Sequence, residues 1–247
     1  MGLREVPPET ELGTTNLDRW LADAPVLKLE RMPWGSNAVF LVRLDGPEGE
    51  LPAVYKPARG ERPLWDFPAG TLHRREVATS VVDRALGWRF TPTTVIREEG
   101  PYGEGSIQEY IPDPPPDLEL DSDQVESSLR GLAALDVLIN NADRKQAHLL
   151  VDPRGELRGI DHGVTFHTEF KLRTALIELG GTAVPLTWLQ DISKLLSDRA
   201  RMSTLRIALA PLLESAEVKA FEQRARALVA QGTYPELHQW HGRPFEW

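Results

Sequence analysis

The sequence predicts an α+β fold with two lobes, of which the first is β-rich with one helix and the second is mainly helical. Short β-prone runs lie before residue 112, and helical patterns rich in Leu and Ala fill most of the remainder. Between them lies PDPPPDLELDSD, which is too rich in proline and acidic residues to form a core element. We therefore expect an N-terminal extension at 1–21, an N-lobe at 22–111, a linker at 112–122 and a C-lobe at 123–247.

The predicted N-lobe has the order β-β-β-α-β-β. Residues 26–43 contain two β-prone runs around Pro-Trp-Gly-Ser-Asn, which is typical of a hairpin, and LPAVYK at 51–56 predicts a third strand. Residues 71–86 place apolar side chains at helical spacing, and Gly87 follows as a stop signal. Two further β-prone segments complete the lobe, at 91–97 and 105–111.

The predicted C-lobe begins with an apolar helix at 123–139, followed by the polar stretch NNADRKQAH. LLVD and ELRGI then flank the turn Pro153-Arg154-Gly155, which predicts a small hairpin. From about 186 to 231 the pattern is helical and is interrupted only by Pro211. Two such lobes leave a cleft at their joint, and a cleft of this kind suits a nucleotide.

Composition narrows the class of protein. The chain has 247 residues, 41% of them hydrophobic and 26% charged, as in ordinary globular proteins. A formal charge of -9 disfavours nucleic acid and anionic membranes as partners. The N-terminus lacks the pattern of a secretory signal, so we expect a cytoplasmic protein. With no cysteine, disulfides, thiolate metal sites and thiol nucleophiles are excluded.

Two aspartates, Asp143 and Asp161, lie at segment ends on either side of the predicted hairpin. Phosphoryl transfer needs one carboxylate to orient the attacking hydroxyl and another to hold the magnesium that bridges the phosphates. Each aspartate singly is also explained by turn formation, because Asp and Gly are common at strand exits. The pair, in the order lysine strand, helix, Asp-Arg loop, hairpin and Asp-x-Gly, favours phosphoryl transfer.

Four segments carry a resemblance to a known family. They are VYKP at 54–57, GERPLWDFP at 60–68, NNADRK at 140–145 and IDHG at 160–163. Over roughly residues 26 to 190 the sequence resembles the phosphatidylinositol 3-/4-kinase-like superfamily, and within it a kinase-like family of actinobacteria. The resemblance implies a two-lobed protein-kinase-like fold, ATP with Mg²⁺ or Mn²⁺ as cofactors, Asp143 as the catalytic aspartate and Asp161 as a metal ligand.

The predicted nucleotide site draws on several elements. Lys56 ends an apolar strand, from which its ammonium could reach the ATP phosphates. A carboxylate of the next helix normally orients such a lysine; the helical pattern permits Glu76 or Asp83, and the resemblance favours Glu76. The other predicted ATP contacts are backbone groups of the hairpin turn and of the strand entering the linker, namely Gly35, Ser36, Asn37, Glu109 and Ile111.

His148 departs from the family pattern. The lipid kinases have asparagine five residues after the catalytic aspartate, where it binds a second metal. Imidazole suits manganese or zinc better than magnesium. His148 is therefore predicted as a metal ligand with an altered preference, while a single-metal site or a purely hydrogen-bonding role stays open. Asp136, in an apolar helix, is interpreted as a structural partner of Arg144 or of loop amides.

Three alternatives to a kinase-like phosphotransferase remain open. A metal-dependent hydrolase could use the His/Asp set His148, Asp161, His162 and His167, although a His-Glu-x-x-His spacing is absent. An inactive nucleotide-binding pseudokinase and an enzyme that transfers AMP are the others. The expected acceptor is a protein hydroxyl or a small polar metabolite, because the chain shows no basic amphipathic surface for membranes. Trp65, Trp88 and Trp188 are interpreted as packing aromatics.

Overall fold

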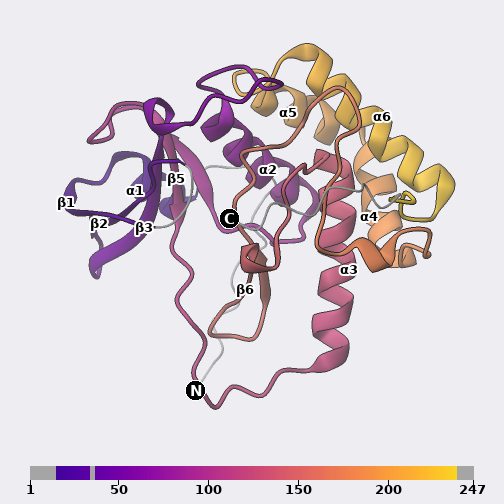
Figure 1. The fold of residues 1–247 in the computed structure, drawn as a ribbon, viewed down its shortest axis with the longest axis horizontal. Helices are drawn as coiled ribbons and strands as arrows, with labels where there is room; N and C mark the ends of the chain where they lie inside the picture. The colour runs from indigo at the N-terminus through magenta and orange to yellow at the C-terminus, as the bar shows by residue number, and fades with distance from the viewer. Residues whose placement is uncertain (1–14, 34–36, 238–247) are drawn as a thin grey trace.

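The computed structural model describes residues 15–33 and 37–237, and within them one five-stranded antiparallel sheet in the order β1-β2-β3-β5-β4. Figure 1 shows this sheet, with one helix beside it, on one side of the molecule and most of the helices on the other. Its strands are β1 (Val26–Arg31), β2 (Phe40–Gly46), β3 (Gly49–Pro57), β4 (Thr94–Arg97) and β5 (Gly105–Glu109). The predicted hairpin at 26–43 is confirmed, because β1 pairs with β2 in antiparallel register.

Six α-helices lie within the described ranges: α1 (Asn16–Asp23), α2 (Leu72–Leu86), α3 (Ser122–Ile139), α4 (Leu186–Ser197), α5 (Arg199–Leu209) and α6 (Ser215–Gln231). Short 3-10 helices are η1 (Ala58–Gly60), η2 (Gln146–His148) and η3 (Ile177–Leu179). The small hairpin forms as predicted, from β6 (Leu149–Val151) and β7 (Leu157–Gly159). None of the helices in the described part of the chain is both long and apolar enough to cross a membrane. The α+β prediction is confirmed.

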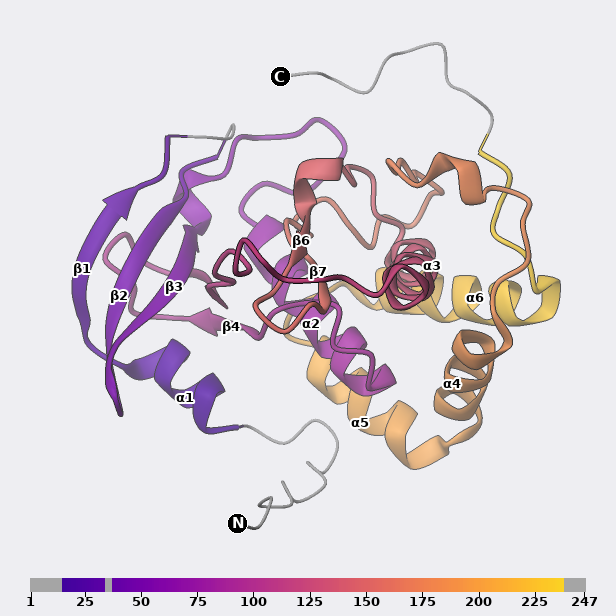
Figure 2. The same ribbon diagram turned by 90° about the horizontal axis from the view of Figure 1, so that it is seen from below.

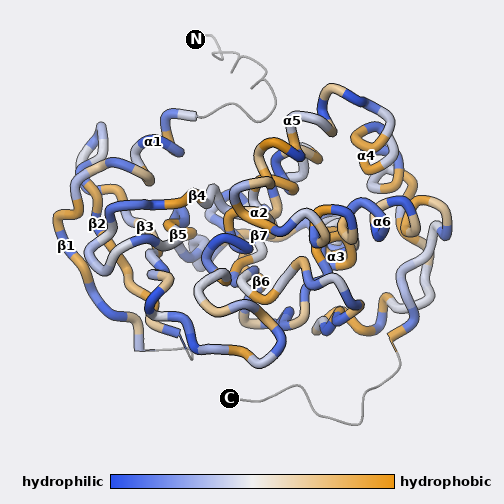
Figure 3. Tube along the Cα trace, turned by 90° about the horizontal axis from the view of Figure 1, so that it is seen from above, coloured by the Kyte–Doolittle hydropathy of each residue, from blue (hydrophilic) through white to orange (hydrophobic). Residues whose placement is uncertain are grey.

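Two hydrophobic cores divide the molecule. The sheet core joins buried strand residues such as Val42, Tyr55 and Ile107 to Leu21 of α1. The helical core joins α3, α4, α5 and α6, and Leu135 and Leu205 are completely buried within it. Figure 2 shows the sheet and α1 at left, the helices α3, α4 and α6 at right and the β6–β7 hairpin between them. Hydrophobic residues gather around α2 and α3 at the centre (Figure 3).

Helix α2 packs with the helical core although it lies between strands of the sheet in sequence. Ala78, Val82, Ala85 and Leu86 belong to that core. The helix ends as predicted at Gly87, whose φ of 75° is a left-handed conformation that glycine adopts without strain. The predicted lobe boundaries at 22–111 and 123–247 stay a prediction, but the packing of α2 links the two.

The structure adds one helix that the sequence reading did not predict. Residues 1–21 were expected to be an N-terminal extension, yet α1 covers Asn16–Asp23 and its Leu21 is completely buried. The Thr15 hydroxyl accepts from the amide of Asp18, whose carboxylate accepts from the amide of Thr15. This reciprocal capping box was visible in the sequence as Thr-x-x-Asp.

The linker crosses the β6–β7 hairpin. The two leucines of the segment, Leu118 and Leu120, have side-chain atoms less than 4 Å from the position that a Cβ on Gly155 would take. Gly155 has a φ of 82°, so it supplies the left-handed residue of this turn. The apolar residues that looked too few to form an element therefore pack on the tip of the hairpin.

Candidate active site

The centre of the candidate site is a cluster of three charged side chains, Lys56, Glu76 and Asp161. They come from the end of β3, from the first turns of α2 and from the residue two positions after β7. Lys56 Nζ donates to Glu76 Oε1 and to Asp161 Oδ1, the latter at 3.1 Å. Glu76 is buried, while the Asp161 side chain is 48% exposed. The structure thus brings together residues that are separated by up to 105 positions in sequence.

The choice between Glu76 and Asp83 is decided by geometry. Asp83 lies two turns later on α2 and accepts from the backbone amide and the hydroxyl of Thr91, at 2.8 and 2.9 Å. Glu76 pairs with Lys56, and its second oxygen accepts from the backbone amide of His162 at 2.9 Å. Glu76 is therefore the carboxylate that orients Lys56.

Charge pairing decides the pKa of Lys56 and of Asp161, whereas burial raises the pKa of the Glu76 carboxyl. The Lys56 ammonium holds the pKa of the Asp161 carboxyl well below its usual range, against the opposing effect of burial. Burial disfavours the charged form of Lys56, but Asp161 and Glu76 outweigh it, so the pKa of Lys56 is raised. At neutral pH the lysine is an ammonium and Asp161 a carboxylate, which is the charge state that phosphate and metal binding require.

Asp161 has an unusual backbone conformation, with a φ of 61° in the left-handed region. Asp tolerates this region better than most residues. The turn lets the next residue, His162, present its amide to Glu76 while Asp161 reaches Lys56. A strained backbone conformation is therefore present at the residue whose carboxylate the site needs.

Buried asparagines hold the loop that carries Asp143 in place. Asn140 closes α3 with a φ of 56°, and Asn141 Oδ1 accepts from the Asp143 amide at 3.0 Å. Both asparagines are completely buried. Asp143 itself is partly exposed, and its carboxylate lies 2.9 Å from Lys145 Nζ. A rigid base therefore presents an accessible carboxylate with a cation beside it.

Arg144 links this loop to the residues after β7. Its guanidinium donates twice to Asp136 at 2.9 Å, once to the Ile160 carbonyl at 2.8 Å and lies 2.7 Å from His162 Nε2. The structural role predicted for Asp136 is confirmed by this pair. Burial and the neighbouring guanidinium lower the pKa of His162, so its neutral ring accepts from Arg144.

His148 lies at the end of η2, next to Asp161. Its Nε2 is 3.3 Å from Asp161 Oδ2, and its Nδ1 accepts from the Lys145 amide at 3.4 Å. An Nδ1 that accepts leaves the proton of the neutral ring on Nε2, which lies beside Asp161. Burial lowers the pKa of His148, and Asp161 only partly offsets this effect. In this tautomer the Nε2 that lies beside Asp161 carries a proton, so it has no free lone pair for a metal.

The cluster does not include three of the predicted ATP contacts, Asn37, Glu109 and Ile111. Gly35 and Ser36 fall outside the described residues, and Asn37 accepts from the Arg62 amide at 2.7 Å. Glu109 pairs with Ala53 on β3, three residues from Lys56, which corresponds to about 10 Å along the strand. Ile111 follows the end of β5.

Few side chains in the described part of the chain are placed to act together as metal ligands. Within the described ranges no group of three or more His, Asp or Glu side chains is arranged to hold a metal ion. Of the set His148, Asp161, His162 and His167, only the first two approach each other: His162 is engaged with Arg144, and His167 packs edge-on against Phe67. The four-residue hydrolase site is therefore not assembled.

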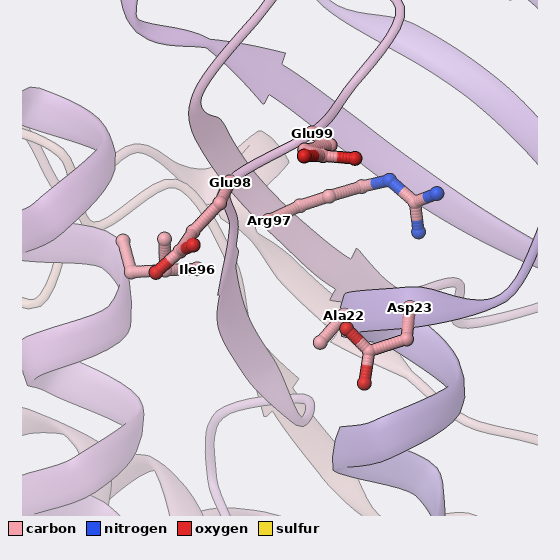
Figure 4. A pocket seen from close by; sticks show the side chains of 6 residues that line it. All are labelled: Ala22, Asp23, Ile96, Arg97, Glu98 and Glu99. Atoms are coloured by element: carbon pink, nitrogen blue, oxygen red, sulfur yellow. The ribbon is translucent and has the colours of Figure 1, made fainter.

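A separate hollow of about 430 Å³ lies between α1 and the end of β4 (Figure 4). It includes none of the clustered residues, and Arg97 extends across it between Glu99 and Asp23. The Arg97 guanidinium donates to the carbonyls of Leu21 and Ala24, at 2.9 and 2.8 Å. Arg97 therefore anchors the C-terminus of α1, which is a structural role.

Comparison with known proteins places the chain in a family. No family model matches the sequence. Protein Rv2133c of Mycobacterium tuberculosis is 36% identical, over 92% of this chain and 93% of that protein. The chain belongs to the Rv2133c family. This relationship extends over nearly the whole of both proteins.

Two solved structures show the same architecture as this Rv2133c-family chain. The structure of hydra Fam20 with sugar matches with a TM-score of 0.62 and 18% identity, over 88% of each chain. The Helicobacter pylori proinflammatory kinase CtkA matches with a TM-score of 0.52 and 8% identity, over 86% of this chain and 94% of that one. The predicted two-lobed kinase-like fold is confirmed.

Two residues of the site and its surroundings, Lys145 and Arg75, receive no role from the sequence motifs. Lys145 could have been noticed as a cation two residues after Asp143. Arg75 lies completely inside the protein beside Glu76, but its partners are far away in sequence, so no local pattern marked it.

Proposed function

We propose that this protein is an ATP-dependent, kinase-like phosphotransferase. The observation that carries the proposal is the Lys56–Glu76–Asp161 cluster, which lies next to the rigid loop that presents Asp143. Phosphoryl transfer depends mainly on positioning and charge stabilisation, and these residues provide both. The kinase-like fold of the chain agrees with this assignment.

Lys56 is the residue that contacts the ATP phosphates. Its ammonium is fixed by Glu76 and keeps its charge, because both neighbouring carboxylates raise its pKa. A fixed point charge at this place neutralises phosphate oxygens without having to reorganise during the reaction. Glu76 acts through Lys56 and is a positioning residue.

Asp161 and His148 are the residues that would hold a divalent metal with the nucleotide. Magnesium in such sites is bound through one or two carboxylates, and the phosphates and water complete its shell. The half-exposed Asp161 fits this role, and His148 either fixes Asp161 through its Nε2 proton or, in the other tautomer, adds a nitrogen ligand. The bound metal supplies charge neutralisation at the phosphate oxygens.

Asp143 orients the acceptor hydroxyl and receives its proton. Its carboxylate is accessible, and its backbone is fixed by Asn141, so it can face an incoming substrate. Lys145, at 2.9 Å from that carboxylate, places a second cation where negative charge develops on the transferred group. The acceptor we propose is a protein hydroxyl or a small polar metabolite, in keeping with the charge of -9. Membership of the phosphatidylinositol 3-/4-kinase-like superfamily is part of this proposal.

The test combines calorimetry with turnover. Purified protein is expected to bind ATP only with magnesium or manganese, and Asp143→Asn is expected to lose at least about a hundredfold in turnover while its ATP affinity stays within about threefold. Asp117→Asn, an exposed linker position, is the matched control and should behave as wild type. Absence of metal-dependent ATP binding by the wild type would contradict the proposal.

Product analysis separates the enzymes that remain. ATP labelled on the γ-phosphate reports transfer of phosphate, whereas label on the α-phosphate reports transfer of AMP. Binding of ATP without transfer of either label to any acceptor tested would favour the pseudokinase.

A further inference from the structure

Arg75 is a buried cation that the proposed chemistry does not use. It precedes Glu76 on α2 and is 2% exposed. Its guanidinium donates to the Thr165 carbonyl and to Glu217 Oε1 on α6, both at 2.6 Å. It also stacks over the Phe67 ring at 5.0 Å. A single side chain therefore connects α2 with the segment after Asp161 and with the C-terminal helix.

Adjacent residues of α2 bind the two ends of one short segment. Glu76 accepts from the amide of His162, and Arg75 donates to the carbonyl of Thr165. Because consecutive helical side chains diverge by about 100°, one residue faces the cluster while the other faces the helical core. The segment that begins at Asp161 is thus held against α2 at two points.

Burying a guanidinium is costly unless it is fully paired, and apolar residues often fill such places without loss of stability. A buried Arg75–Glu217 pair is therefore a weak explanation of stability. The pair better explains how α2 is positioned, because the planar guanidinium donates to its partners in only one geometry. What this geometry fixes is the position of Glu76 relative to Asp161.

We propose that Arg75 is a positioning residue that fixes α2 against the helical core, so that Glu76, Lys56 and Asp161 are assembled before nucleotide binds. The inference rests on the proposed function for its consequence on ATP, but its structural part can be measured without ATP. Movement of the first turns of α2 away from the site would break a buried ion pair, so the pair opposes displacement of this helix.

The decisive variant is the double substitution Arg75→Met with Glu217→Gln. Removing both charges avoids leaving one of them buried and unpaired. The Glu214 amide donates to Glu217 at 2.9 Å, and a glutamine at position 217 retains an oxygen that can accept this hydrogen bond. The matched control is Arg206→Met with Glu222→Gln, which removes another arginine–glutamate pair involving α6 but leaves α2 untouched.

Three properties are measured on wild type and both variants: melting temperature, affinity for ATP with magnesium, and hydrogen exchange of the backbone amides at 160–166. We expect the Arg75/Glu217 variant to melt within a few degrees of wild type, to bind ATP about tenfold more weakly and to exchange the His162 amide about tenfold faster. The Arg206/Glu222 control should match wild type in binding and exchange. Arg75→Lys, which can reach only one of the two partners, should lie between.

The outcomes distinguish the two proposals. Unchanged exchange at 160–166 in the Arg75/Glu217 variant overturns the positioning role, whatever happens to ATP. If the wild type binds ATP, and the Arg75/Glu217 variant exchanges these amides faster but binds ATP with unchanged affinity, the positioning role is also overturned. If the wild type does not bind ATP, the proposed function fails, and the exchange data still decide whether Arg75 fixes the segment.

Discussion

At the scale of single residues, the site is built from groups whose ordinary behaviour has been altered by their neighbours. Asp161 sits in a left-handed conformation beside an ammonium, and Lys56 is held charged by two carboxylates. The sequence indicated these residues because a lysine strand, an Asp-Arg loop and Asp-x-Gly follow one another in this order along the chain. It could not indicate Arg75, whose meaning depends on Glu217, 142 positions away.

His148 offers a prediction about the metal. In His148→Asn the amide oxygen replaces an imidazole, so we expect the ratio of magnesium to manganese affinity for ATP binding to shift by about threefold or more. His167→Asn, whose ring packs on Phe67, is the control. Calorimetry with each metal measures the effect. Identical metal profiles for wild type and His148→Asn would show that His148 is no ligand.

Asp83 offers a prediction about pH. Burial raises the pKa of its carboxyl to about 6, from 3.8 in solution. The folded protein therefore binds more protons than the unfolded chain between these values, and stability must fall as pH rises through them. Asp83→Asn should remove this loss, so that its free energy of unfolding relative to wild type improves by up to about 3 kcal/mol between pH 4 and pH 7. Urea unfolding at both pH values measures it, and a pH-independent difference would contradict it.

At the scale of secondary structure, local sequence patterns predicted most helices and strands but did not predict which of them pack together. Gly87 and the apolar spacing marked α2 correctly. The capping box at Thr15 would have marked α1, whose short length left no long apolar pattern. Trp65 was interpreted as a packing residue, which is wrong: it is 92% exposed, with Lys171 over its ring at 4.9 Å. Burial depends on tertiary position, which aromatic character alone does not determine.

Helix α3 provides a prediction at this scale. A Cβ on Gly131 would lie 2.4 Å from the Phe90 ring and 2.8 Å from Trp188. These rings pack together with Trp88 behind α3, so they have little room to move. Gly131→Ala should cost about 1–3 kcal/mol despite the better helix propensity of alanine. Denaturant unfolding measures the cost, with the exposed Ser127→Ala as control; an increase in stability would contradict close packing here.

At the scale of the whole molecule, the sheet and the helices form separate cores; α2 belongs to the helical core and also contacts β4 and β5 of the sheet. The chain order of the first lobe predicted its strands and helix, but the sequence did not show that this helix packs with the other lobe. That packing places Glu76 between Lys56 on the sheet and Asp161 on the helical side. The candidate site is therefore a property of the lobe joint, in keeping with the kinase-like fold.

The most direct test of the central claim is a crystal structure of the protein with a non-hydrolysable ATP analogue and Mn²⁺, whose anomalous signal locates the metal. We predict the metal on Asp161, the α- and β-phosphates at Lys56 and the γ-phosphate facing Asp143. A nucleotide bound away from Lys56 and Asp161, or one whose α-phosphate faces Asp143, would contradict phosphoryl transfer by this site.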